Sequence, residues 1–132
     1  MLQSNKKLWE DSDMPIRALL MDIDDTLFDF QTSSRNALSI AFRALNLPFT
    51  PEMWAHYREL DAEFWQRFER GEITKEALYV ERFRVFFAEY GLEADPAAFN
   101  TAYFCELGAQ RNFMPHCEQA LRQLHAQYKI FI

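Results

Sequence analysis

The chain has 132 residues, of which 49% are hydrophobic and 26% charged, and its formal net charge is −6. This composition predicts one globular domain of ordinary size and argues against a disordered chain. The longest basic run, Lys6-Lys7, is too short for the positive stripe that nucleic-acid backbones require, so we expect no nucleic-acid partner. We expect a cytoplasmic protein without membrane contact, because no apolar run reaches spanning length and the polar N-terminus lacks a signal-peptide core.

The cysteines and histidines indicate no metal centre. Cys105 and Cys117 lack the spacing of metal ligands and the context of a disulfide framework, so we expect both to be buried, reduced thiols. The three histidines are scattered without a paired spacing, which argues against zinc.

The first predicted element is a strand in residues 16–22, with the sequence IRALLMD. A short, continuous apolar run of this kind is typical of a strand buried on both faces of a parallel sheet. Because ligands of open α/β sheets bind at the carboxyl ends of the strands, the acids that follow this run are candidates for a site.

From Ser34 onward the apolar residues adopt helical spacing, which predicts four amphipathic helices and a helical unit of about 70 residues. We take the aromatic stripes as packing between helices, although a cofactor or partner surface is the alternative. Caps and stops place the ends of these helices; the marking residues are Thr50, Pro51, Gly71, Thr74, Gly91, Asp95 and Pro96.

After Pro115 the sequence predicts one more helix and then a strand in residues 128–132. The chain is therefore divided into three parts. Residues 1–33 hold a leader, the first core strand and an acidic loop, residues 34–110 form the helical insertion, and residues 111–132 form a return helix and a second core strand.

The acidic loop carries the chemistry. Asp22 and Asp24 follow the first strand two residues apart, so in an extended chain they face the same side with Cα atoms about 6–7 Å apart. Two carboxylates at this separation can share a metal ion or flank one reacting group. Magnesium, which is usually held by one or two carboxylates plus waters and phosphate, would relieve their repulsion. Thr26 adds a hydroxyl two residues further on.

Two alternatives compete with this interpretation. A lone D-x-D is usually a solvated turn or a helix cap. A calcium loop beginning at Asp22 would need Gly at its sixth position and Glu at its twelfth, where this chain has Leu27 and Ser33. The combination of an apolar strand, D-x-D-x-T and following helices favours a functional site over a turn.

The stretch from Ile16 to Phe30, IRALLMDIDDTLFDF, resembles the first motif of haloacid dehalogenase (HAD) superfamily phosphatases. The helical insertion is similar to the mobile cap of one branch, and the segment FWQRFERGEITKEALYVERF resembles cytosolic pyrimidine 5′-nucleotidases most. The resemblance implies an α/β, HAD-like (Rossmann-like) core fragment of two parallel strands with an inserted α-helical cap, mostly helical in content.

The resemblance also implies the roles of residues. Asp22 would attack phosphorus and form an aspartyl-phosphate, and Asp24 would protonate the leaving oxygen and then activate water. Asp22 and Asp24 would hold Mg²⁺, and Thr26, assigned to the same cofactor site, would orient the loop. Asp24 favours phosphatase over dehalogenase chemistry, since a halide needs no proton to leave. The expected substrate is a small phosphorylated metabolite or nucleotide, in particular a nucleoside 5′-monophosphate.

Three family elements have no counterpart before Ile132: a phosphate-binding Thr or Ser, a Lys, and an acidic pair. Relatives also commonly have Pro-Gly-Ala where this chain has Pro115, His116 and Cys117. We therefore expect a truncated product, inactive and prone to aggregate because two parallel strands expose their faces and edges. The alternative is a non-catalytic helical binding module or subunit. No feature of the sequence indicates an oligomeric state.

Overall fold

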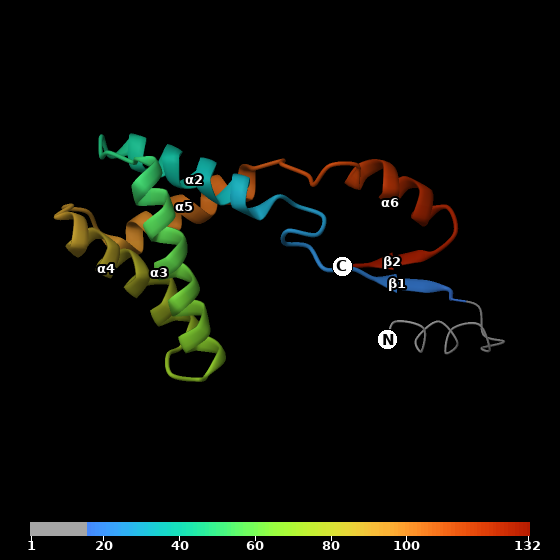
Figure 1. Ribbon diagram of the computed structural model, residues 1–132, viewed down its shortest axis with the longest axis horizontal. Coiled ribbons are helices and arrows are strands. Elements are labelled where there is room, and N and C mark those ends of the chain that lie inside the picture. The colour runs from blue at the N-terminus through green and yellow to red at the C-terminus, as the bar shows by residue number, and fades with distance from the viewer. Residues whose placement is uncertain (1–15) are drawn as a thin grey trace, which may run out of the picture. The chain divides into compact units, whose positions relative to one another are not determined.

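The computed structural model describes residues 16–132, which form two short strands and five helices (Figure 1). These elements are β1 (Ala18–Leu20), α2 (Phe30–Ala44), α3 (Pro51–Glu69), α4 (Lys75–Tyr90), α5 (Pro96–Ala109), α6 (Cys117–His125) and β2 (Lys129–Phe131). The chain divides into two compact units. Residues 30–112 form the helical unit; among the described residues, 16–29 and 113–132 form the core unit.

The helical unit contains α2 to α5 and has a closed aromatic core. Helix α5 packs against α2 and α4, and α4 packs against α3. Phe83 lies at the centre, with its ring centroid 4.9 Å from that of Phe99, 5.6 Å from that of Tyr57 and 5.7 Å from that of Tyr103. The aromatic stripes therefore serve mainly as packing, as the helical spacing indicated. The buried side chains of this core belong to Ala37, Leu38, Ala41, Phe42, Met53, Tyr57, Leu60, Phe64, Leu78, Phe83, Phe86, Phe87, Phe99 and Tyr103.

Side-chain caps begin three of these helices where the sequence placed them. The Thr50 and Thr74 hydroxyls accept from the backbone N–H groups three residues later, and the Asp95 carboxylate accepts from two N–H groups of α5. Gly91 ends α4 with φ +62°, the left-handed conformation that glycine adopts without strain. These predicted boundaries are confirmed.

Gly71 is also confirmed as a stop, because α3 ends at Glu69 with Arg70 as its cap and Gly71 follows in the left-handed conformation at φ +72°. Two other details of the prediction are wrong. Helix α2 begins at Phe30, four residues before the predicted helical start. Cys105 is exposed, because α5 turns Tyr103 into the core and a residue two positions further lies about 200° around the helix. Cys117 is buried, as expected.

The core unit has a two-stranded parallel sheet with α6 between the strands in sequence. Leu19 pairs with Ile130, and the Met21 N–H donates to the Phe131 carbonyl at 2.9 Å, so the ladder reaches one residue beyond β1. Each strand has three residues, and Leu20 and Phe131 are 86% and 55% exposed. The predicted burial of the first strand on both faces is thus not found, since only the middle residue of each strand is half-buried and the residues beside it are exposed.

None of the helices in residues 16–132 is long and apolar enough to cross a membrane.

Candidate active site

A tight loop follows β1 and carries the acids. The Ile23 carbonyl accepts hydrogen bonds from three backbone N–H groups, those of Thr26 at 3.2 Å, Leu27 at 2.8 Å and Phe28 at 3.0 Å. The Asp25 N–H donates to the Phe28 carbonyl at 2.7 Å. Because these bonds converge within six residues, the loop has a defined backbone on which side chains can be held.

The end of this loop is fastened to the segment that precedes α6. Phe28 forms an antiparallel bridge with Phe113, and their ring centroids are 4.8 Å apart. The Met114 N–H donates to the Leu27 carbonyl at 2.9 Å, and the Leu27 side chain is buried. The acidic loop is therefore tied at its start by the β1–β2 ladder and at its end by residues 113–114.

The Asp22 side chain is exposed and fixed by one hydrogen bond. The Thr26 hydroxyl donates to Asp22 Oδ2 at 3.0 Å, which leaves Oδ1 outside this bond. Thr26 thus orients the Asp22 carboxylate and, through its own N–H bond to Ile23, the loop.

Asp24 lies close enough to Asp22 and Asp25 for their negative charges to affect its pKa. Partial burial raises the pKa of the Asp24 carboxyl above its usual range, and the nearby charges of Asp22 and Asp25 raise that pKa further. Asp24 therefore holds a proton more readily than an isolated aspartate does. Asp25 contributes charge from a left-handed backbone, with φ +58°, a conformation that Asp tolerates better than most residues.

The donor set suits a hard cation of the magnesium type. Nowhere in residues 16–132 do three or more His, Cys, Asp or Glu residues gather as a metal site. The loop offers the carboxylates of Asp22 and Asp24 together with its backbone carbonyls. Magnesium is commonly bound by one or two carboxylates, with waters and substrate phosphate completing its shell. The mutual repulsion that raises the pKa of Asp24 is also what a divalent cation would offset.

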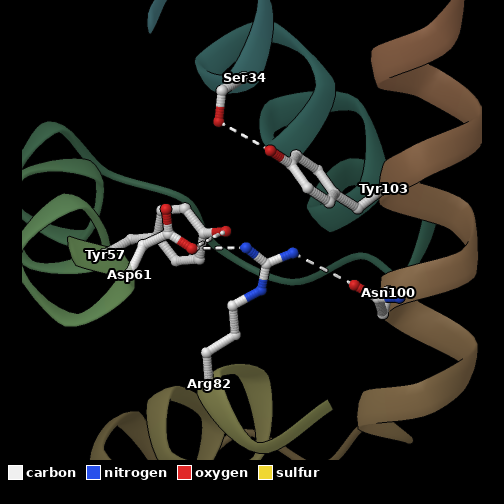
Figure 2. A network of polar contacts seen from close by, with 6 residues as sticks. All are labelled: Ser34, Tyr57, Asp61, Arg82, Asn100 and Tyr103. Carbon is white, nitrogen blue, oxygen red and sulfur yellow. Dashed lines mark hydrogen bonds and ion pairs between the residues drawn. The ribbon is translucent and has the colours of Figure 1, made fainter. Parts of the chain in front are cut away.

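A second polar cluster, which was not predicted from the sequence, lies inside the helical unit (Figure 2). Arg82 of α4 is 3% exposed and pairs with Asp61 of α3 and Asn100 of α5. The sequence does contain a pattern that indicates this cluster, because Arg82 lies four residues from Leu78 and from Phe86 on the apolar stripe of α4. A charged residue on such a stripe indicates a buried partner.

The chain was compared with known protein families, curated proteins and solved structures. No family model matches the chain. Over 118 residues it is 35% identical to the protein named "Putative HAD-hydrolase YfnB" of Bacillus subtilis (strain 168), an alignment that covers 88% of this chain and 49% of YfnB. A crystal structure of YfnB in its orthorhombic form matches with a TM-score of 0.85 and 32% identity, covering 89% of this chain and 51% of that one. The YfnB structure is bound to magnesium and is described as revealing interdomain movement.

The chain, helical for the most part and with two parallel strands, matches about half of a HAD hydrolase in structure. The chain is homologous to YfnB and spans about half the length of that relative. The α/β fold class expected from the first motif is confirmed by this match. The relative's name identifies no substrate, and the resemblance to 5′-nucleotidases gains no support from it.

Proposed function

We propose that the chain supplies the nucleophile and the acid–base group of a magnesium-dependent phosphatase acting on phosphate monoesters. The observation that carries this proposal is the pair of acids at the end of β1. The Asp22 carboxylate is exposed and oriented by Thr26, and two residues later Asp24 has a raised pKa. One group is therefore suited to attack and the other to carry a proton.

In the first step an oxygen of Asp22 forms a bond to phosphorus as the bond from phosphorus to the ester oxygen breaks. The Asp24 carboxyl gives its proton to the departing oxygen, so an alcohol leaves. In the second step the Asp24 carboxylate takes a proton from water, the water oxygen bonds to phosphorus, and the Asp22–phosphate bond breaks. Inorganic phosphate leaves, and both acids return to their starting states.

The Asp22 carboxylate and the main-chain carbonyl of Asp24 would hold the magnesium ion, which when bound supplies positive charge that stabilises the phosphoryl oxygens. The Asp24 side chain then stays available to carry the proton. Thr26 keeps the Asp22 carboxylate oriented during both steps, since its hydroxyl donates to the oxygen Oδ2. Oδ1 is then the better placed atom for attack on phosphorus.

For the substrate we propose a small phosphorylated metabolite, specifically a nucleoside 5′-monophosphate. An acidic chain without a basic stripe suits a small phosphate ester that arrives with a metal ion better than a nucleic acid. The other half of a YfnB-like protein would contribute the remaining groups of the active site, so the full activity belongs to a protein that contains both halves.

A chimera tests this proposal. Replacing the matching half of YfnB with this chain gives a protein in which every catalytic role assigned above falls to Asp22 and Asp24. We expect it to release phosphate from p-nitrophenyl phosphate and nucleoside monophosphates only with magnesium present. Asp22→Asn should lower kcat by at least about a thousandfold, since loss of a nucleophile can cost up to about a millionfold. Asp25→Asn, which keeps the loop conformation, should change it by less than about tenfold. Equal activity of the two variants would refute the assignment of the nucleophile.

A second candidate function rests on the exposed apolar residues of the sheet. Ile16, Leu20, Phe131 and Ile132 are each more than half exposed. In this alternative the chain is a non-catalytic binding module, and neither acid matters. Phosphatase activity in the chimera that depends on Asp22 would exclude it.

A further inference from the structure

The polar cluster in the helical unit fixes the position of one carboxylate, that of Asp61. Arg82 Nη1 donates to Asp61 Oδ1 at 2.5 Å, and Arg82 Nη2 donates to Asn100 Oδ1 at 3.3 Å (Figure 2). The guanidinium is also enclosed by aromatic rings, with its central carbon 4.9 to 5.8 Å from the four ring centroids of Tyr79, Phe83, Tyr103 and Phe104. Because these contacts fix the Arg82 guanidinium, its hydrogen bond also fixes the position of the Asp61 carboxylate.

The two oxygens of Asp61 are used unequally. Oδ1 accepts from Arg82 and also from the Tyr57 hydroxyl at 3.4 Å. Oδ2 accepts no hydrogen bond from any residue in the part of the chain that the structure describes. The Asp61 side chain is 19% exposed, so this acceptor is partly shielded from water. An ionised oxygen in such a place gains from a donor brought by a ligand.

Asp61 lines a groove of about 460 Å³ between α2 and α3. The half-buried Phe30 and Trp54 give it aromatic walls, and Ser34 and Tyr57 lie at its buried side. The exposed Arg58 also lines it, with its guanidinium carbon 5.9 Å from the Trp54 ring centroid. Aromatic walls, one fixed acceptor and one cationic donor are the features of a site for a flat, polar ring.

We propose that this groove binds a nucleobase whose ring carries both an exocyclic amino group and a carbonyl, as that of cytosine does. The amino group donates to Asp61 Oδ2, Arg58 donates to the ring carbonyl, and the base packs against the Trp54 wall. A base with a carbonyl in place of the amino group, as in uracil, sets two acceptors against each other. This inference rests on the proposed function only for its choice of a nucleotide as the substrate.

The test measures binding of nucleosides without phosphate to the full chain, by NMR shift titration or calorimetry. We expect cytidine to bind at least about tenfold more tightly than uridine, a difference typical of one well-placed hydrogen bond to a charged group. Ribose alone should not bind measurably. Equal affinities for cytidine and uridine, or binding of ribose alone, would overturn the assignment.

Two variants locate the site. Trp54→Leu should weaken cytidine binding about tenfold or more, since an aromatic stacking partner contributes this much for a base. Trp65→Leu is its matched control, because Trp65 is also half-buried on α3 but does not line the groove, and it should leave the affinity within about twofold. The opposite order would contradict the proposal.

Asp61→Asn tests the direction of the hydrogen bond. The new amide can keep its oxygen toward Arg82 and present its NH₂ to the groove, so the preference should change from cytidine to uridine. If this variant does not fold, because Arg82 loses its charged partner, the nucleoside comparison and the two tryptophan variants still decide the question.

Failure of the proposed nucleobase site can be distinguished from failure of the proposed phosphatase activity. Cytidine has no phosphate, so its binding should be unchanged by Asp22→Asn and by removal of magnesium. Cytidine binding without any hydrolysis in the chimera would refute the proposed activity and leave this inference standing. Phosphate release from nucleotides without discrimination between cytidine and uridine in binding would do the reverse.

Discussion

The helical unit and the core unit differ in how far they bury their apolar side chains and pair their backbone groups. Four helices satisfy their backbone groups internally, and their apolar faces close on one another around Phe42 and Phe83, which are both fully buried. The two parallel strands satisfy only part of their backbone groups, and side chains such as Leu20 and Ile132 lie mostly in solvent. A helical segment can therefore form a complete core from consecutive sequence, whereas a parallel sheet needs further strands and covering layers.

The largest expected effect is a cavity in the helical core. Phe83→Ala removes a fully buried ring with four aromatic neighbours and should lower the free energy of unfolding by about 3–5 kcal/mol. Urea titration followed by helical circular dichroism measures it. Leu20→Ala in β1 is the control, and because Leu20 is 86% exposed it should change stability by less than about 0.5 kcal/mol. Equal losses would mean that the sheet is as well packed as the bundle.

The second expected effect concerns the buried ion pair in the core of the helical unit. Arg82→Met removes a 3% exposed cation and leaves Asp61 without its charged partner. Because Asp61 keeps 19% exposure to water, the cost in the same titration should lie at the low end of that for a buried pair, at about 3 kcal/mol. Arg84→Met, two residues along α4, removes an exposed arginine paired with Glu81 and should leave the midpoint of the titration nearly unchanged. A gain in stability for Arg82→Met would show that the buried pair is kept for a reason other than folding, such as the positioning of Asp61.

The units also differ in how far the sequence predicts them. The caps at Thr50, Thr74 and Asp95 and the stop at Gly91 depend on contacts within one turn of helix, so local sequence was sufficient for these boundaries. The pairing of β1 with β2 joins residues more than a hundred positions apart. It followed from the resemblance to a known family, since periodicity alone does not specify a strand's partner.

The candidate site divides in the same way. D-x-D-x-T marked Asp22, Asp24 and Thr26 from sequence, and the structure adds the hydrogen bond from Thr26 to Asp22 and the convergence of amides on Ile23. No spacing rule indicates a carbonyl that accepts three N–H groups. Asp61 and Arg82 were missed because they lie on different helices and become partners only when α3 and α4 pack.

A third prediction concerns pH and acts on the helical unit alone. Burial raises the pKa of the Tyr57 phenol well above its ordinary value of 10.0, and that of Tyr103 is raised for the same principal reason. These groups are neutral in both states below pH 10, but above it the unfolded chain loses their protons first. Stability should therefore be constant toward neutral pH and fall as pH rises above 10.

Melting temperatures of the wild type and of Tyr57→Phe across that range measure this contribution. The variant should show a shallower decline above pH 10, since its ring cannot ionise in the unfolded chain. At neutral pH it should be destabilised by about 1 kcal/mol for the lost hydrogen bond to Asp61. Parallel pH profiles for the two proteins would show that Tyr57 is accessible to hydroxide in the folded state.

The smallest expected effect lies in the core unit, at the turn before α6. His116 caps α6 with φ +62° and makes no side-chain capping bond, so it carries the strain of a left-handed backbone without compensation. His116→Gly should relieve it and stabilise α6 by about 0.5–1 kcal/mol. Because the helical unit dominates any global signal, amide hydrogen exchange within residues 117–125 is the appropriate measurement. Asn46→Gly, at φ +55° after α2, is the matched control and should gain less, since asparagine tolerates this conformation. If slower exchange in α6 extends to β2 and to the loop around Asp22, the core unit opens as one cooperative piece; if it is confined to α6, the acidic loop is held by its own hydrogen bonds.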